Sequence, residues 1–165
     1  MPAPEGTSTL EHEIRIDARP ETVFQFFTDP AKLVEWMGEE AMLDPRPGGV
    51  CRLAFNPAAV VSGKFVEVEP YSRLVFTWGW EAEMFAVPPA STEVAIELTP
   101  EGDSTLLRLT HRALPEAAVR FHTVGWQHYL RRLGAVAAGH DPGPDAAPGV
   151  VDPSLIPGRG KGDLQ

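Results

Sequence analysis

The 165-residue sequence has one cysteine, few basic residues and no long uncharged apolar stretch. The single cysteine, Cys51, excludes an intrachain disulfide and a zinc site built from several thiolates, and it is typical of a cytoplasmic protein. Lys and Arg number 14 against 23 Asp and Glu, and a net charge of −9 disfavours nucleic-acid and anionic-membrane partners. The sequence shows no export signal at residues 1–9, and no membrane span is predicted because nowhere do about eighteen uncharged apolar residues follow one another.

Hydrophobic residues make up 43% of the chain, which suits one compact domain and leaves no length for a second. The composition changes near residue 138, because residues 139–165 contain five prolines and six glycines. We therefore predict a folded domain over residues 8–138 and a flexible tail over residues 139–165. In the alternative, four apolar residues of this tail dock on the domain or on a second subunit: Val150, Val151, Leu155 and Ile156.

Short segments in which apolar residues occupy every second position predict strands with one buried face. The inward sets are Leu10, His12, Ile14 and Ile16; Cys51, Leu53 and Phe55; Val66 and Val68; Leu74, Phe76, Trp78 and Trp80; Val94, Ile96 and Leu98; and Leu107, Leu109 and His111. The connections between these segments are short and rich in proline or glycine, as at residues 46–49. Such connections favour an antiparallel meander.

Three further segments have helical spacing. Residues 20–28 and 31–37 predict two short helices after the first strand, and residues 116–138 predict a long one that spans about 35 Å. Arg19 is a poor residue for the capping position of the first helix, so packing must hold that helix in place. The element order predicts an α+β layer structure in which the sheet curves around the long helix.

A series of motifs, in order and with the expected spacing, carries a resemblance to a known family. The motifs are residues 16–24, Phe27-Thr28-Asp29-Pro30, Trp36, Arg46-Pro47-Gly48-Gly49, Gly63 with Val66, Phe76-Thr77-Trp78, residues 107–111, and Gly125-Trp126 with Leu130 and Leu133. Over residues 8–138 the chain resembles the activator of heat-shock-protein-90 ATPase homologue family of the START-like (SRPBCC) superfamily, in its small stand-alone bacterial form. The resemblance implies a helix-grip fold: a curved antiparallel sheet of six to seven strands, wrapped around the C-terminal helix with a cavity between them. It implies no universal catalytic set.

Aromatic rings are the first candidates for a binding site in such a cavity. Trp36, Phe76, Trp78, Trp80 and Trp126 are expected to converge between the sheet and the long helix. Each ring is also explained as core, since burying about 150–250 Å² of aromatic surface is strongly favourable without any ligand. A curved sheet facing one helix, however, leaves a gap that a ligand can occupy.

His111 and His122 complete the candidate ligand-binding set, because each lies on an otherwise apolar face. Three roles are open for them: a core histidine satisfied by hydrogen bonds, a polar contact that orients a ligand, or a general acid-base catalyst. His122 and His128 lie on different helix faces, so no metal site is predicted. No cofactor is predicted either, since no glycine-rich phosphate loop is present. Glu81 and Glu83 are expected to flank the cavity mouth.

Three functions compete at this point. The first hypothesis is a protein that binds a small apolar or aromatic ligand in the cavity. The second is a cyclase- or hydrolase-type enzyme that uses a cavity histidine, as superfamily relatives do. The third is an interaction module for a heat-shock ATPase chaperone. The family resemblance also makes a homodimer plausible.

Overall fold

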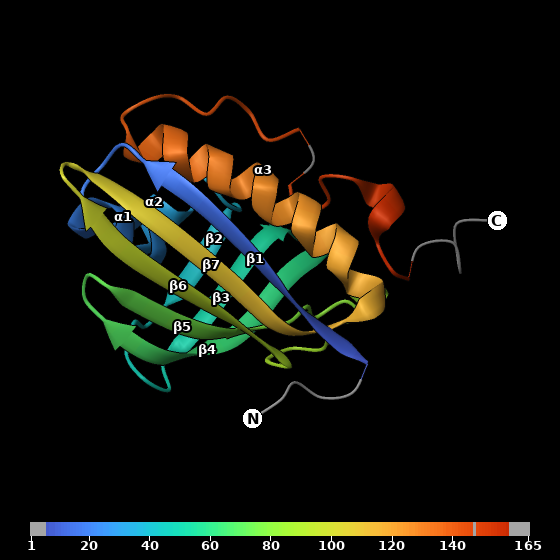
Figure 1. The fold of residues 1–165 in the computed structure, drawn as a ribbon. Coiled ribbons are helices and arrows are strands. Elements are labelled where there is room, and N and C mark those ends of the chain that lie inside the picture. Colours follow the sequence, from blue (N-terminus) through green and yellow to red (C-terminus); the bar gives the residue numbers. More distant parts are fainter. Residues whose placement is uncertain (1–5, 147, 159–165) are drawn as a thin grey trace.

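A seven-stranded antiparallel sheet and one long helix dominate the computed structural model, which describes residues 6–146 and 148–158 (Figure 1). The strands are β1 (Thr7–Ile16), β2 (Glu40–Leu43), β3 (Val50–Asn56), β4 (Ala59–Glu69), β5 (Arg73–Trp78), β6 (Thr92–Glu101) and β7 (Ser104–Pro115). Their order across the sheet is β1-β7-β6-β5-β4-β3-β2. Strands β2 to β7 therefore form the predicted meander, and β1 extends it by pairing with β7.

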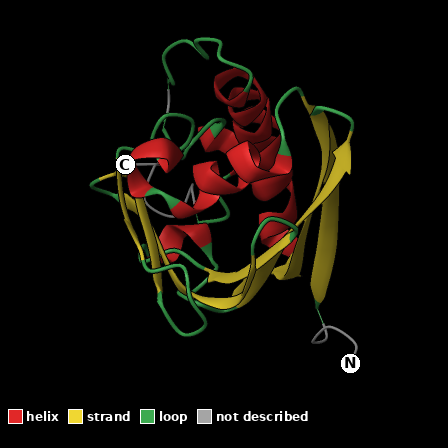
Figure 2. Cartoon of the chain, turned by 90° about the vertical axis from the view of Figure 1, so that its left-hand side faces the viewer, coloured by secondary structure: helices red, strands yellow, loops and turns green. Residues whose placement is uncertain are grey.

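The helices all lie on the concave side of the sheet, which curves around them (Figure 2). They are α1 (Pro20–Thr28), α2 (Pro30–Leu33) and α3 (Val119–Ala137), with short 3-10 turns η1 (Glu83–Phe85), η2 (Glu116–Ala118) and η3 (Pro153–Leu155). This arrangement confirms the predicted α+β helix-grip fold. Within the described chain, no helix combines the length and the apolarity needed to cross a membrane.

Packing, rather than capping, holds α1 in place. The Arg19 side chain makes no capping hydrogen bond, as expected, whereas Val23, Phe24, Phe26 and Phe27 are buried. Apolar side chains at this spacing share one helix face, so the helix is fixed by the face it buries.

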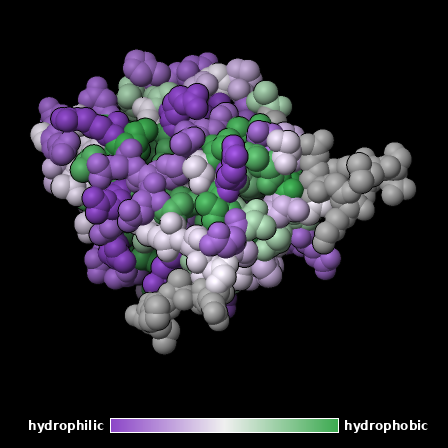
Figure 3. Space-filling view, turned by 45° about the vertical axis from the view of Figure 1, so that its right-hand side comes forward, coloured by the Kyte–Doolittle hydropathy of each residue, from purple (hydrophilic) through white to green (hydrophobic). Residues whose placement is uncertain are grey.

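The convex face of the sheet is polar and carries ion pairs between neighbouring strands. Arg73 contacts Glu67 at 2.8 Å and Glu97 at 3.3 Å, and Arg112 contacts Glu93 at 2.9 Å. These groups are partly exposed, so each pair contributes at most about 1 kcal/mol. In the view of Figure 3, polar residues surround smaller apolar patches.

One strand prediction was wrong at Val66, which is 47% exposed although the alternation placed it inside. The register between β4 and β5 shifts between Phe65 and Glu67, so an extra residue is inserted at this point of the ladder. Such a bulge reverses the faces that follow it. As a result Phe65 is buried, at 1% exposure, in the layer that the sequence assigned to Val66.

The described part of the segment after α3 packs on the domain, within the range 139–165 for which a flexible tail is predicted. We call its described part, residues 141–146 and 148–158, the C-terminal strap. Gly149 and Ile156 are buried, and Val150, Val151 and Leu155 pack against the core. This matches the alternative in which these apolar residues dock on the domain. Residues 147 and 159–165, which the prediction also covered, lie outside the described residues.

Candidate functional site

Three indoles and two imidazoles meet between the sheet and α3. His111 lies on β7, Trp78 ends β5, Trp80 follows in the next loop, and His122 and Trp126 come from α3. All five side chains are at most 4% exposed. The sequence alternation and the helical spacing bring them together as predicted.

His122 accepts two hydrogen bonds from tryptophans. The Nε1–H groups of Trp78 and Trp80 both donate to its Nε2, at 3.3 and 3.0 Å. An indole nitrogen can only donate, so Nε2 carries no proton. The proton is on Nδ1, which donates to the Ala118 carbonyl at 2.8 Å. The neutral imidazole thus joins the loop, the sheet and the helix.

His111 is satisfied in the same way. Its Nδ1 accepts from the Trp126 indole at 3.0 Å, so its Nε2 carries the proton and donates to the Thr92 hydroxyl at 2.8 Å. Thr92 in turn donates to the Trp78 carbonyl at 2.7 Å. Each nitrogen of both imidazoles therefore has a partner within the protein.

Burial keeps both histidines neutral. It lowers the pKa of His122 to about 4, although the hydrogen bond to the Ala118 carbonyl opposes the shift. It also lowers the pKa of His111 well below its ordinary value, and the nearby His122, with ring centroids 5.2 Å apart, adds to the effect. Of the three roles left open by the sequence, the hydrogen-bonded core histidine fits this geometry, because neither imidazole has a free lone pair to offer a substrate.

The cavity beside this cluster is small. Its volume is about 30 Å³, room for about one water molecule, so no ring compound fits while the cavity is closed. Ring stacking fills the remaining space, because Trp80 lies between Phe85 and Phe55 with centroid distances of 4.1 and 5.5 Å. The lining residues are Met37, Phe55, Trp78, Trp80, Phe121, His122, Gly125, Trp126, Tyr129, Gly149 and Val151.

The predicted site residues divide into those at the cavity and those elsewhere. Trp78, Trp80, His122 and Trp126 line the cavity, and His111 is hydrogen-bonded to Trp126 behind them. Phe76 lines a second hollow of about 20 Å³. Trp36 lines neither hollow and packs edge-on against Phe27 at 5.2 Å.

Several lining residues were not among the predicted ones. Phe55 and Tyr129 could have been found, since strand alternation and helix spacing already turned them inward. Gly149 had no such signal, whereas Val151 was named only in the alternative in which apolar residues of the tail dock on the domain.

Trp36 has a structural role that a proline explains. A helical residue 30 would donate its N–H to the Phe26 carbonyl, but Pro30 has none. The Trp36 indole donates to that carbonyl instead, at 2.9 Å. We expect Trp36→Phe to lower the free energy of unfolding by about 1–2 kcal/mol, since it leaves a buried carbonyl unpaired. Urea denaturation would measure this loss, and a variant as stable as the parent protein would contradict the assignment.

Glu81 is held by hydrogen bonds, and the Cys51 thiol is unreactive. Glu81 accepts from Ser62 and from Arg52, the latter at 3.1 Å, and these hydrogen bonds lower its pKa. Burial raises the pKa of the Cys51 thiol to about 12, which keeps it protonated and unreactive. Among the residues with assigned positions, no three His, Cys, Asp or Glu side chains are grouped so that they could hold a metal ion.

Comparison with known proteins agrees with this architecture. The profile of the family described as activator of Hsp90 ATPase homolog 1-like protein matches residues 17–138. The chain belongs to this family. The match covers strands β2 to β7 and all three α-helices, whereas β1 and the strap lie outside it. No curated protein matches the chain.

Several solved structures resemble the chain over most of its length. An AHSA1-like protein from Rhizobium etli is 45% identical, with 85% of this chain and 88% of that one covered and a TM-score of 0.68. CalU16 from Micromonospora echinospora is 33% identical, with 82% and 77% covered and a TM-score of 0.65. An HSP90 activator from Plasmodium falciparum is 22% identical, with 78% and 94% covered and a TM-score of 0.62, and shares the fold.

Proposed function

We propose that this protein binds a small, uncharged, ring-containing molecule between the sheet and α3. The observation that carries the proposal is the character of the wall: Trp78, Trp80 and Trp126 direct their N–H groups to histidines. What remains for a guest is mostly ring face and edge, which favours stacking with another ring.

A guest needs more room than the closed cavity provides. The sheet and α3 are tied together by the tryptophan–histidine hydrogen bonds, so enlarging the cavity through these elements would break buried polar contacts. Four lining residues belong to neither a named strand nor a helix: Met37, Trp80, Gly149 and Val151. Trp80 is part of the hydrogen-bonded cluster and Met37 is buried in the core, which leaves Gly149 and Val151 of the C-terminal strap. Their displacement is the route to a larger cavity that leaves the cluster intact.

A link to small-molecule metabolism is compatible with one structural neighbour. DynU16 is 23% identical, with 86% of this chain and 51% of that one covered and a TM-score of 0.70. It is described as a putative protein in the dynemicin biosynthetic locus. The catalytic-histidine alternative has less support, because both imidazoles are occupied. Contact with a heat-shock ATPase rests on the family relation alone.

Gly125 offers a direct test of binding. It lines the cavity from α3, and a Cβ placed there meets nothing within 4 Å. We expect Gly125→Leu to add a bulky side chain at the cavity wall and weaken binding of the neutral fluorescent probe N-phenyl-1-naphthylamine at least about tenfold. Titration of the probe followed by its fluorescence would measure the effect.

Gly134→Ala is the matched control, since it lies on the same helix and its Cβ would make an ordinary 3.6 Å contact with Ile14. Both substitutions replace a helical glycine, so both favour the helix. The control should bind the probe like the parent protein. Failure of the parent protein to bind the probe, or equal binding by Gly125→Leu, would contradict the proposed site.

A further inference from the structure

The C-terminal strap forms part of the cavity wall through Gly149 and Val151. From the end of α3 it runs back along the helix (Figure 1). The Gly158 amide donates to the Met84 carbonyl of η1 at 2.6 Å, and the neighbouring Phe85 stacks on Trp80. The strap thereby connects the helix to the loop beside the cavity.

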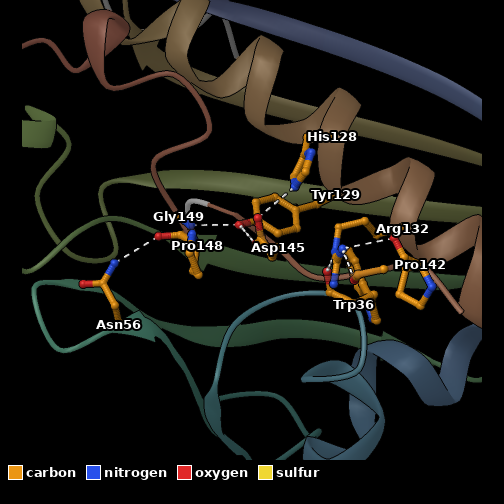
Figure 4. A network of polar contacts seen from close by, with 10 residues as sticks. Trp36, Asn56, His128, Tyr129, Arg132, Pro142, Asp145, Pro148 and Gly149 are labelled. Atoms are coloured by element: carbon orange, nitrogen blue, oxygen red, sulfur yellow. Dashed lines mark hydrogen bonds and ion pairs between the residues drawn. The ribbon is translucent and has the colours of Figure 1, made fainter.

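A latch near the start of the strap is built around Asp145. The Tyr129 hydroxyl donates to Asp145 Oδ2 at 2.6 Å, and His128 Nε2 lies 3.1 Å from Oδ1 (Figure 4). The same Tyr129 oxygen accepts from the Gly149 amide at 2.8 Å. One lining residue of the cavity thus holds the strap at two points.

Gly149 is the seat of the strap over the cavity. Its φ is +76°, and a Cβ there would lie 2.7 Å from Phe55 Cβ and 2.8 Å from Phe55 Cγ. Only glycine allows this approach, because the Cβ of any other residue would clash with Cβ and Cγ of the buried Phe55 side chain. Beside it, Asn56 donates to the Pro148 carbonyl at 3.0 Å.

The strap has less regular backbone hydrogen bonding than the sheet and the helix that it covers. Its only regular element is the one-turn η3, whereas each interior strand of the sheet is hydrogen-bonded on two sides. Segments held by few contacts open at lower free energy than sheet strands. Near the start of the strap Arg132 donates to the Gly143 carbonyl at 2.9 Å, so release beyond this point leaves the strap attached there.

We infer that the C-terminal strap is a lid, latched by Tyr129 and Asp145 and seated by Gly149 on Phe55, which must lift for an apolar guest to enter. The inference rests on the proposed function for the identity of the guest. The lid itself is a property of the protein alone, because lifting it exposes the indoles of Trp78, Trp80 and Trp126 whether or not a guest is present.

Two variants release the strap in different ways. Gly149→Ala places a methyl group against Phe55 and so displaces this part of the strap. Its matched control is Gly143→Ala, because Gly143 is a strap glycine with φ +77° whose added Cβ would have nothing within 4 Å. Asp145→Ala removes the latch, and its control is Asp103→Ala, which removes one exposed carboxylate elsewhere. Thermal melts followed by circular dichroism verify that each variant folds.

Two readouts separate the lid from the guest. Acrylamide quenching of tryptophan fluorescence reports exposure of the indoles, and stopped-flow mixing with N-phenyl-1-naphthylamine gives the association rate. We expect both releasing variants to show stronger quenching and about tenfold faster association, because a larger share of molecules is open. Both controls should stay within about twofold of the parent protein.

Each result has a definite meaning. Folded releasing variants that match their controls in quenching would overturn the lid, even if the probe binds tightly to all of them. Stronger quenching in the releasing variants without probe binding in any protein would support the lid and contradict the proposed function.

Discussion

Acidification from pH 7 to pH 5 is expected to lower the free energy of unfolding by about 2 kcal/mol through His122 alone, as urea denaturation at the two pH values would show. The pKa of His122 is about 4 in the folded protein, against 6.5 for an ordinary histidine. At pH values between about 4 and 6.5, the unfolded chain binds a proton at His122 that the folded chain does not bind. The free energy of unfolding therefore falls as the pH falls. Burial depresses the pKa of His111 in the same direction, and its contribution adds to the loss.

His122→Gln tests the assignment, because glutamine keeps an acceptor for the indoles and does not titrate. We expect this variant to lose less stability between pH 7 and pH 5 than the parent protein does. His140→Gln replaces an exposed histidine and should keep the full pH dependence. A parent protein equally stable at both pH values, or an unchanged slope in His122→Gln, would show that His122 is not the neutral imidazole described above.

Replacing Gly79 by alanine is expected to lower the free energy of unfolding by about 3 kcal/mol, measured by urea denaturation. A Cβ at this position would lie 1.7 Å from the Pro88 carbonyl oxygen and 2.7 Å from Pro89 Cα. The obstacle is backbone, so the whole loop from Trp80 must move. The stacking of Trp80 on Phe85 should weaken with it.

Gly125→Ala is the matched comparison for the stability effect. The chemical change is the same, but the position is helical and its Cβ meets nothing within 4 Å. We expect a gain of about 1 kcal/mol here, since alanine is the better helix former. Losses of equal size at both positions would mean that the close approach of Pro88 to Gly79 does not exist in solution.

The aromatic part of the site was predictable from the sequence because it is encoded locally. Trp78 and Trp80 follow a period of two and Trp126 follows helical spacing, so the side of the element on which each ring lies is set by its neighbours in the chain. The same logic failed at Val66, where a bulge changed the faces. At Trp36 it gave the buried side correctly but not the place, since the indole bonds to the carbonyl that Pro30 leaves unpaired and does not line the cavity. Both differences depend on a partner distant in the sequence or on a local irregularity.

The sequence by itself determined the order of elements, most of the buried faces and therefore the α+β layer structure, because side-chain periodicity and turn chemistry act between near neighbours. Only the tertiary structure decided the pairing of each indole with an imidazole nitrogen and the docking of the strap on Phe55 and Tyr129. These contacts join residues up to 94 positions apart, as Phe55 and Gly149 do, and no local pattern encodes them. Apolar residues in a proline- and glycine-rich segment acquire a partner only once the folded domain offers a surface to cover.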